Sequence, residues 1–288
     1  MRLLRNSARA LTSTALLSGA LLLGALPASA AVVPSWSWSQ GITFTSATFS
    51  PGGGCTTVTP TLVQWGDCVV PSAQSRVVIQ APNPATSPPL AITSSPIPVP
   101  GVTLRHDNNP ILGTHAFLTS GSFASSITLI PSIGLPPFPA PIVGGLVVGF
   151  TETVNSNPGP DGINGTADDC GFPEGAGLSP SCPDIFSVPG LPSLVSFFSY
   201  DSDGVGPDAP VTYAVTAFAG GLGPLSAAAC VAAGMAPGCL GFITFEGLSN
   251  FLPTGFVIHA LVPEPASLIL LGAGLLGLGA VAGFRRRK

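Results

Sequence analysis

Short runs of alternating apolar and polar residues occupy the middle of the chain, and stretches rich in Gly, Pro, Asn and Asp separate them. Alternation with a period of two is typical of strands buried on one face. The runs predict strands at 42–45, 47–49, 76–80, 102–106, 126–130, 142–154, 194–200, 211–218, 241–246 and 256–262. One helical turn is predicted between Leu225 and Gly234. Because no amphipathic helix separates the strands, we expect an all-β fold, an antiparallel β-sandwich with long Gly/Pro-rich loops.

The N-terminus has a different pattern. Arg2, Arg5 and Arg9 precede an apolar stretch at 10–26, which ends in Pro27-Ala28-Ser29-Ala30. A basic segment, an apolar segment and small residues in this order are typical of a secretory signal peptide. We predict a signal peptide over 1–30, used by the Sec export machinery and cut by signal peptidase between Ala30 and Ala31. An uncleaved anchor is the alternative, which the helix-breaking Pro27 disfavours.

The C-terminus carries a second apolar segment. Residues 266–284 contain no charge, and Arg285-Arg286-Arg287-Lys288 follow them. Nineteen helical residues span about 28 Å, enough to cross a hydrocarbon core. The basic end at 285–288 should stay cytoplasmic. The sequence therefore predicts a transmembrane helix over 266–284.

Pro263-Glu264-Pro265 stands directly before this segment. The motif, the Gly/Leu-rich span and the basic end, in this order, resemble the PEP-CTERM sorting tail of exported bacterial proteins. The resemblance implies recognition by an exosortase, cleavage near the motif, and a host that makes exopolysaccharide. A permanent single-pass anchor is the alternative. We accordingly expect an exported domain at 31–261, with a Pro-rich loop at 82–100, and a sorting tail at 262–288. The protein would be held in the inner membrane before processing and then reach the cell surface or the medium.

Charge is sparse in the exported part. Between residues 31 and 262 only Arg76 and Arg105 are basic, against twelve acidic residues. Phosphate backbones are bound by Lys and Arg, so this balance excludes nucleic acid as a partner. The chain has 36 Gly and 32 Pro, but its abundant alternating apolar residues argue for a folded domain with stiff loops.

All six cysteines lie in the exported part, in three close pairs. Six cysteines can pair in 15 ways, and pairing each cysteine with its neighbour in sequence closes the shortest loops. In an oxidising compartment we expect the disulfides Cys55–Cys68, Cys170–Cys182 and Cys230–Cys239.

Arg105-His106-Asp107-Asn108-Asn109-Pro110 follows a predicted strand. His106 and Asn108 match the His and Asn of the THxN family of PEP-CTERM proteins, which this stretch resembles; Arg105 stands where that family has Thr. Further resemblance runs through 150–155, 182–186 and 239–247. His106 could be a metal ligand or catalytic base, with Asp107 or His115, or part of a hydrogen-bonded turn that fixes the strand end.

Two acidic loops are candidates for calcium, the one cofactor that the sequence suggests. The candidate ligands are Asp161, Asn164, Asp168 and Asp169 in the first loop and Asp201, Asp203 and Asp208 in the second. Calcium takes six to eight oxygen ligands, and Gly lets the chain fold around the ion. Neither loop has the Glu that completes an EF-hand, and solvated turns use the same residue types.

A secreted hydrolase needs facing carboxylates, for which Glu152, Glu174, Asp184 and Glu246 are available without a spacing that selects a pair. Trp36, Trp38 and Trp65 could stack on sugars or fill the core. No catalytic constellation emerges. The leading hypothesis is an exosortase-sorted cell-surface or matrix protein, associated with biofilm exopolysaccharide and without enzymatic activity. A calcium-dependent carbohydrate-binding or adhesive module is the alternative.

Overall fold

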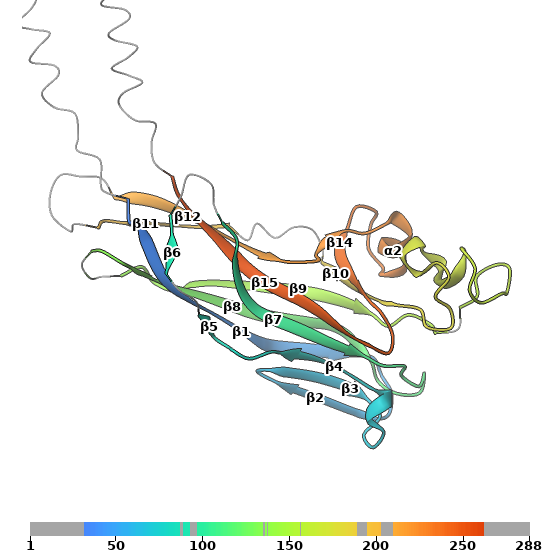
Figure 1. The fold of residues 1–288 in the computed structure, drawn as a ribbon. Coiled ribbons are helices and arrows are strands. Elements are labelled where there is room, and N and C mark those ends of the chain that lie inside the picture. Colours follow the sequence, from blue (N-terminus) through green and yellow to red (C-terminus); the bar gives the residue numbers. More distant parts are fainter. Residues whose placement is uncertain are drawn as a thin grey trace, which may run out of the picture.

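The computed structural model describes residues 32–86, 89–92, 97–134, 136, 138–155, 157–188, 195–202 and 210–261. Within these residues the chain forms two curled antiparallel sheets that face one another (Figure 1). The first has the order β13 (Gly223–Pro224), β14 (Leu240–Thr244), β10 (Asp184–Val188), β9 (Ile142–Thr151), β8 (Leu118–Pro131), β1 (Ser35–Phe49), β5 (Ala85–Thr86), with β6 (Leu90–Ala91) also on β1. The second has the order β11 (Val195–Tyr200), β12 (Val211–Ala219), β15 (Leu248–Leu261), β7 (Val99–Asn108), β4 (Gln74–Ile79), β3 (Leu62–Gly66), β2 (Cys55–Thr59). The expectation of an all-β sandwich is confirmed.

The core lies between the sheets, and strand alternation builds it. Along β1, Trp36, Trp38, Gln40, Ile42 and Phe44 point inward and are buried, while the residues between them are more exposed. These side chains meet the second sheet, for example where the rings of Trp38 and Phe256 lie edge to face at 5.1 Å. Trp36 packs in the same way against three rings, those of Phe198, Tyr200 and Tyr213.

All three tryptophans are buried, so they fill the core and do not form an exposed sugar platform. Large aromatic side chains contribute most to a core when they are fully covered. Of the two interpretations of the tryptophans, the structure confirms the core.

Several strands differ from those that the alternation predicts. The sequence misses β2, β3 and β10 and the two-residue strands β5, β6 and β13. All five residues of β10 are buried although Asp184 and Ser187 are polar, so no alternation of apolar and polar residues marks this strand. β15 begins at Leu248 rather than 256, and its pairing with β7 shifts between Pro253 and Gly255. This irregularity accommodates a proline inside a strand, which is why the sequence pattern hides the first half of β15.

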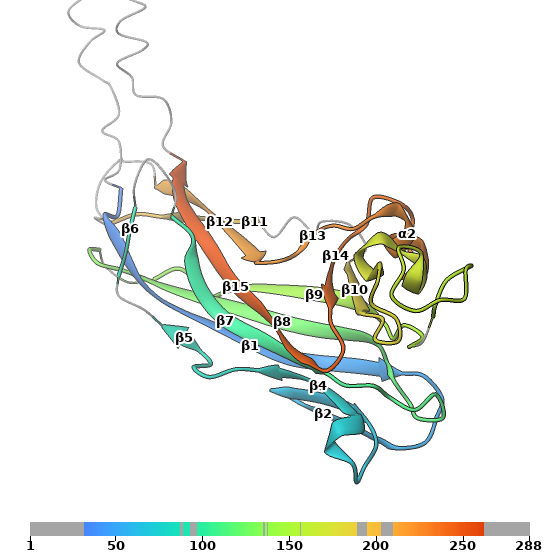
Figure 2. The same cartoon turned by 45° about the vertical axis from the view of Figure 1, so that its right-hand side comes forward.

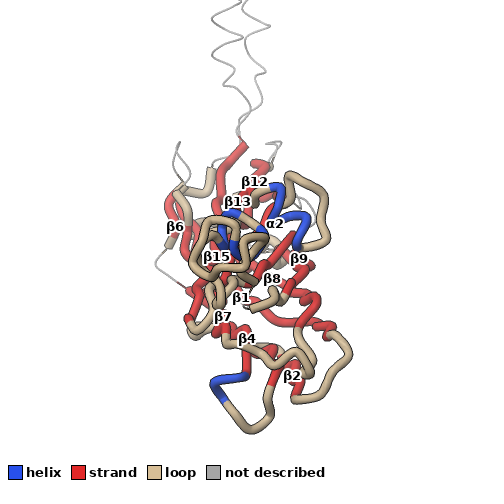
Figure 3. Tube along the Cα trace, turned by 90° about the vertical axis from the view of Figure 1, so that its right-hand side faces the viewer, coloured by secondary structure: helices blue, strands red, loops and turns tan. Residues whose placement is uncertain are grey.

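The three disulfides pair as expected, Cys55–Cys68, Cys170–Cys182 and Cys230–Cys239. Two of them belong to a small lobe that contains η2 (Asp169–Gly171), η3 (Pro173–Gly175) and the helix α2 (Ala227–Ala232), within the predicted 225–234 turn. A second apolar cluster contains Phe172 and Ala229 of the lobe together with Ile185 of β10. Figure 2 shows the lobe beside β10 and β14, and Figure 3 shows its helical turns in front of the strands. A separate turn, η1 (Pro71–Ala73), lies between β3 and β4.

β1 begins and β15 ends at the same end of the molecule, away from the lobe (Figure 1). Among the described residues, no helix has the length and apolarity needed to cross a membrane. The predicted signal peptide, its Ala30/Ala31 cleavage site, the Pro263-Glu264-Pro265 motif and the 266–284 span lie outside the described residues.

Candidate functional site

Three acidic side chains meet at the lobe end of the sandwich. The carboxylates of Glu152, Asp184 and Glu246 each offer an oxygen within 4.8 Å of the others. We call these three residues the carboxylate cluster. Glu152 and Asp184 are 32 residues apart in the sequence, and Asp184 and Glu246 are 62 residues apart, so only the fold brings the three together.

Neighbouring strands of the first sheet position the cluster. Glu152 directly follows β9, Asp184 begins β10, and Glu246 lies in the turn between β14 and β15. The register pairs Ile185 with Thr151 and Asp184 with Thr244, so the three carboxylates arrive at one edge. Because β14 and β15 belong to different sheets, the Glu246 turn links the two layers at this end.

The carboxylate oxygens of the cluster are mostly buried and lack hydrogen bonds, although the Glu152 residue as a whole is partly exposed. Asp184 is 0% exposed and Glu246 9%. Asp184 accepts one hydrogen bond at Oδ1 from the Thr153 N–H, at 2.9 Å, and Glu246 accepts a long one at Oε1 from Asn155 Nδ2, at 3.4 Å. Asp184 Oδ2, Glu246 Oε2 and both carboxylate oxygens of Glu152 have no hydrogen-bond partner among the described residues. Buried polar atoms are normally paired, so these four oxygens require an explanation.

Burial raises the pKa of all three carboxyl groups, and repulsion between carboxylates adds to it for Glu152 and Asp184. Desolvation is the main cause for Glu152, and the charge of Glu246 adds to it; the Trp65 indole acts in the opposite direction, although its Nε1 makes no hydrogen bond of normal geometry. For Asp184, desolvation again comes first and the charge of Glu152 second. Desolvation also raises the pKa of Glu246. Three charges this close must be neutralised by protons or by a cation.

Two amide side chains border the cluster. Asn108, the last residue of β7, is 0% exposed and donates from Nδ2 to the Thr244 carbonyl at 3.0 Å. Its amide lies against Asp184 and lowers the pKa of that carboxyl group, while its Oδ1 has no partner among the described residues. Asn155 Oδ1 is likewise unpartnered. The site therefore offers oxygen ligands alone, which is the chemistry of hard cations.

His106 lies two residues before Asn108 on the same inward face of β7. Its ring stacks on Trp65 at 5.5 Å and meets Phe150 and Phe186 edge to face at 5.6 and 5.1 Å. Burial lowers the pKa of His106 to about 3, a shift that Asp107 partly opposes. The imidazole is therefore neutral at ordinary pH, and both its nitrogens lack partners among the described residues. It belongs to an aromatic wall beside the cluster.

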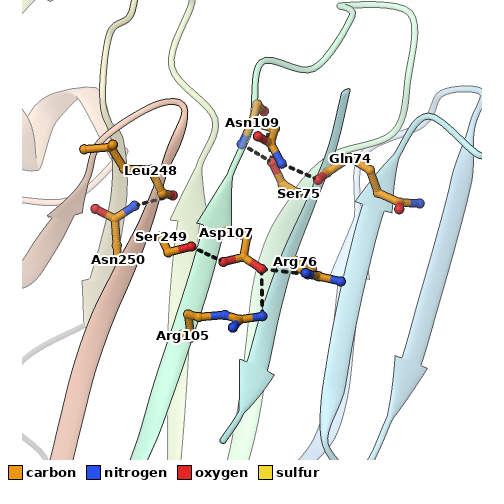
Figure 4. A network of polar contacts seen from close by, with 9 residues as sticks. All are labelled: Gln74, Ser75, Arg76, Arg105, Asp107, Asn109, Leu248, Ser249 and Asn250. Carbon is orange, nitrogen blue, oxygen red and sulfur yellow. Dashed lines mark hydrogen bonds and ion pairs between the residues drawn. The ribbon is translucent and has the colours of Figure 1, made fainter. Parts of the chain in front are cut away.

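The expected turn at His106 is wrong, and so is its pairing with Asp107. β7 continues to Asn108, and adjacent side chains of a strand point to opposite faces. Figure 4 shows Asp107 on the outer face, where its Oδ2 accepts from Arg76 Nε at 2.7 Å and from Arg105 Nη2 at 3.0 Å. Ser249 donates to its Oδ1 at 2.6 Å. Arg76 and Arg105 are thus engaged away from the carboxylate cluster.

The acidic loop at 161–169, one of the two predicted calcium loops, satisfies itself. Asp169 is buried, and its Oδ2 accepts the N–H groups of Gly165, Thr166 and Ser179 at 2.8, 3.1 and 3.3 Å. The other oxygens bond in the same local way: Asp161 accepts from Ile163, Asp168 from Asp161 and Thr166, and Asn164 from Ser179. In the second loop Asp201 is described, whereas Asp203 and Asp208 lie outside the described residues. Calcium at either loop stays a prediction.

An apolar cavity of about 310 Å³ separates the sheets farther along the sandwich. Leu146 and Val148 from β9, and Val215 and Phe218 from β12, contribute to its walls, with His106 at the inner side. Its chemistry suits an apolar molecule.

Sequence reasoning named the members of the cluster only as unpaired candidates of a hydrolase. The signal available was position: each acidic residue adjoins an apolar strand run, and the THxN resemblance pointed to Asn108. Comparison of the chain with protein-family models, with curated proteins and with solved structures finds no match.

Proposed function

We propose that the protein is an exported cell-surface or matrix protein without enzymatic activity, sorted by an exosortase through its C-terminal tail. The observation that carries the proposal is the set of three closed disulfides in the part of the chain between the two predicted targeting ends. Disulfides persist in oxidising compartments, so the domain suits the outside of the cell.

The direction of the chain supports display on a surface. β15 is 14 residues long and runs from the lobe end to the end that leads into the tail. At about 3.3 Å per residue it spans about 45 Å. A domain held at residue 262 would therefore present the lobe and the carboxylate cluster far from the membrane.

Burial argues against a sugar hydrolase at the cluster. A hydrolase needs two carboxyl groups that touch the sugar, about 5 Å apart in retaining enzymes. Asp184 has no exposed surface, and Glu246 keeps 9%. These groups are accessible to a proton or an ion rather than to a sugar ring.

The mass of the protein recovered from its host tests the proposal. We expect a chain that begins at Ala31, ends near Pro263-Glu264-Pro265, has no free thiols, and is found in the envelope or the exopolysaccharide. A cytosolic chain with both ends intact and reduced cysteines would refute export. An intact C-terminus in the membrane fraction would refute sorting and leave the permanent anchor.

The second candidate is a calcium-dependent adhesive or carbohydrate-binding module, and the oxygen-only carboxylate cluster is the observation that favours it. Its test is retention of the protein on exopolysaccharide from its host, with calcium and then with EDTA. Equal retention in both conditions would rule out calcium dependence.

A further inference from the structure

We propose that the carboxylate cluster binds a Ca²⁺ ion and so fastens the two sheets together at the lobe end. The two neighbouring amides, Asn108 and Asn155, complete the ligand set. The inference concerns residues outside both acidic loops, and it rests on geometry rather than on the proposed export.

The ligand count suits calcium. Six side-chain oxygens of these five residues have no hydrogen-bond partner among the described residues: Glu152 Oε1 and Oε2, Asp184 Oδ2, Glu246 Oε2, Asn108 Oδ1 and Asn155 Oδ1. Calcium takes six to eight oxygens, with carboxylates and amide carbonyls as its usual protein ligands. Binding would pair all six buried acceptors at once.

Asn108 is independent support, because it is not acidic and lies on the other sheet. Its side chain is fully buried against Asp184, and its Oδ1 has no partner among the described residues. A buried amide oxygen without a donor carries a desolvation cost, which a cation at this position would offset. Its Nδ2 donates to the Thr244 carbonyl, while Oδ1, the acceptor of the same amide, has no donor among the described residues.

No arginine or lysine side chain among the described residues neutralises the three carboxylates. Arg76 and Arg105 are the two basic residues between 31 and 262, and both bind Asp107 on the outer face of β7. The charge of three carboxylates therefore has no counter-ion from the exported part of the chain. A divalent cation is the ligand with the matching charge and size.

Distance favours calcium over magnesium. Two ligand oxygens on one ion can be separated by at most twice the metal–oxygen distance, about 4.6–5.2 Å for calcium and about 4.0–4.2 Å for magnesium. The cluster oxygens lie within 4.8 Å of one another. Calcium accommodates separations up to this value and accepts irregular geometry, whereas magnesium allows a narrower range and demands a nearly ideal octahedron.

The site would join elements of both layers. Glu152 and Asp184 come from the first sheet, Asn108 from the second, and Glu246 from the turn that connects them. The Cys170–Cys182 disulfide ends two residues before Asp184 and restrains the backbone that leads into this ligand. Calcium should therefore stabilise the folded domain as well as bind to it.

The test uses the protein recovered from its host with its disulfides intact, treated with EDTA, dialysed, and then given CaCl₂ or MgCl₂. We expect one Ca²⁺ retained per chain. The melting temperature should rise by about 5–10 °C when free calcium stands about 100-fold above Kd. Terbium, which replaces calcium, should emit on tryptophan excitation because Trp65 borders Glu152.

Matched variants place the site. Glu246→Gln and Asp184→Asn each keep one acceptor oxygen, replace the other by an NH2 group and remove one charge, and they should weaken binding on the order of 100-fold. Asp161→Asn makes the same charge change in the acidic loop and should leave binding unaltered. Trp65→Phe should abolish terbium emission while calcium is still retained, a readout that does not need the acidic variants to fold.

Three outcomes would overturn the inference. The first is wild-type protein that retains no calcium and shows no thermal shift. The second is binding lost with Asp161→Asn but kept with Glu246→Gln, which would move the site to the acidic loop. The third is equal stabilisation by magnesium, which would reject calcium as the ion. None of these outcomes bears on the mass of the exported chain, so the proposed function is judged separately.

Discussion

The acidic loop at 161–169 and the carboxylate cluster contain similar side chains in opposite situations. In the loop, the carboxylates of Asp161, Asp168 and Asp169 accept hydrogen bonds from N–H and O–H groups within about ten residues. In the cluster, four carboxylate oxygens accept none from the described residues. The loop resembles a metal site in its sequence, whereas the cluster resembles one because its buried oxygens lack hydrogen bonds.

The difference lies in the origin of the neighbours. Asp, Asn and Gly close together in sequence form turns whose backbone N–H groups solvate the carboxylates directly. Residues at the ends of separate strands meet after most of their backbones are committed to the sheet, so few N–H groups are left for them; in the cluster, only Asp184 accepts a backbone N–H group among the described residues, that of Thr153. A dense acidic stretch is therefore a weaker sign of a metal than scattered acidic residues that the fold buries together.

The largest effect that separates the two regions should come from Asp169→Ala. The change leaves the N–H groups of Gly165, Thr166 and Ser179 without their acceptor in a buried loop. We expect the free energy of unfolding to fall by about 3 kcal/mol, equally with and without calcium. Urea denaturation in calcium and in EDTA measures both values. A loss seen in calcium alone would mean that Asp169 is a metal ligand.

The second prediction is a change in stability, caused by Glu152→Gln, whose sign depends on whether calcium is present. Burial, and then the charge of Glu246, raises the pKa of Glu152 to about 8, so folding near neutral pH requires this carboxyl group to take up a proton. Glu152→Gln removes that requirement, so in EDTA near neutral pH the variant should be more stable than the wild type by about 1–2 kcal/mol. In saturating calcium it should be less stable, because a charged ligand is lost. Thermal melts of both proteins in both buffers give the comparison. The same sign in both buffers would contradict the difference drawn between cluster and loop.

A smaller effect is expected for His106→Phe. The histidine packs between Trp65, Phe150 and Phe186, and its two nitrogens have no partner among the described residues. Phe keeps the stacking, so stability should change by less than about 1 kcal/mol, and calcium affinity by less than about threefold. Calcium titration followed by terbium emission measures the affinity. A large loss of affinity would make His106 part of the ion site rather than of its aromatic wall.

The sheets were predictable in part where one face is buried: alternation of apolar and polar residues predicted the second half of β1 and nearly all of β12. The disulfides were predictable as well, because close cysteine pairs close short loops. β10 was not, because burial on both faces erases the period of two, and Pro253 concealed the start of β15. The carboxylate cluster could not be predicted for a different reason. Its geometry depends on the register of β9, β10 and β14, which only the assembled sheet defines.

His106 and Asn108 show the same limit at the level of a motif. The resemblance drew attention to both positions, and the spacing of two correctly places them on one face of an extended chain. Which face is inward depends on the pairing of β7 with β15 and β4. Asp107, the neighbour that the sequence made the natural partner of His106, therefore faces the two arginines outside.

The smallest effect concerns Glu174, a lobe carboxylate that, like those of the acidic loop, is satisfied locally. It accepts from the Ser226 N–H at 2.9 Å and from Ser226 Oγ at 2.8 Å, beside the start of α2. Desolvation opposes these bonds, but the net result is a lowered pKa for Glu174. The folded state therefore holds the proton less tightly than the unfolded chain. The stabilisation is complete above the unfolded pKa of 4.5 and is lost as pH falls through the lower folded value.

Because Glu174 is well solvated, the contribution should be a few tenths of a kcal/mol. Glu174→Gln should reduce stability by that amount at pH 7 and by less at pH 3, irrespective of calcium. Urea denaturation at the two pH values measures the difference, and Glu152→Gln in EDTA is the contrasting variant because it removes a carboxyl group whose raised pKa destabilises the fold near neutral pH. If Glu174→Gln raised stability at pH 7, Glu174 would behave like a member of the cluster, and local satisfaction would no longer separate the two kinds of carboxylate.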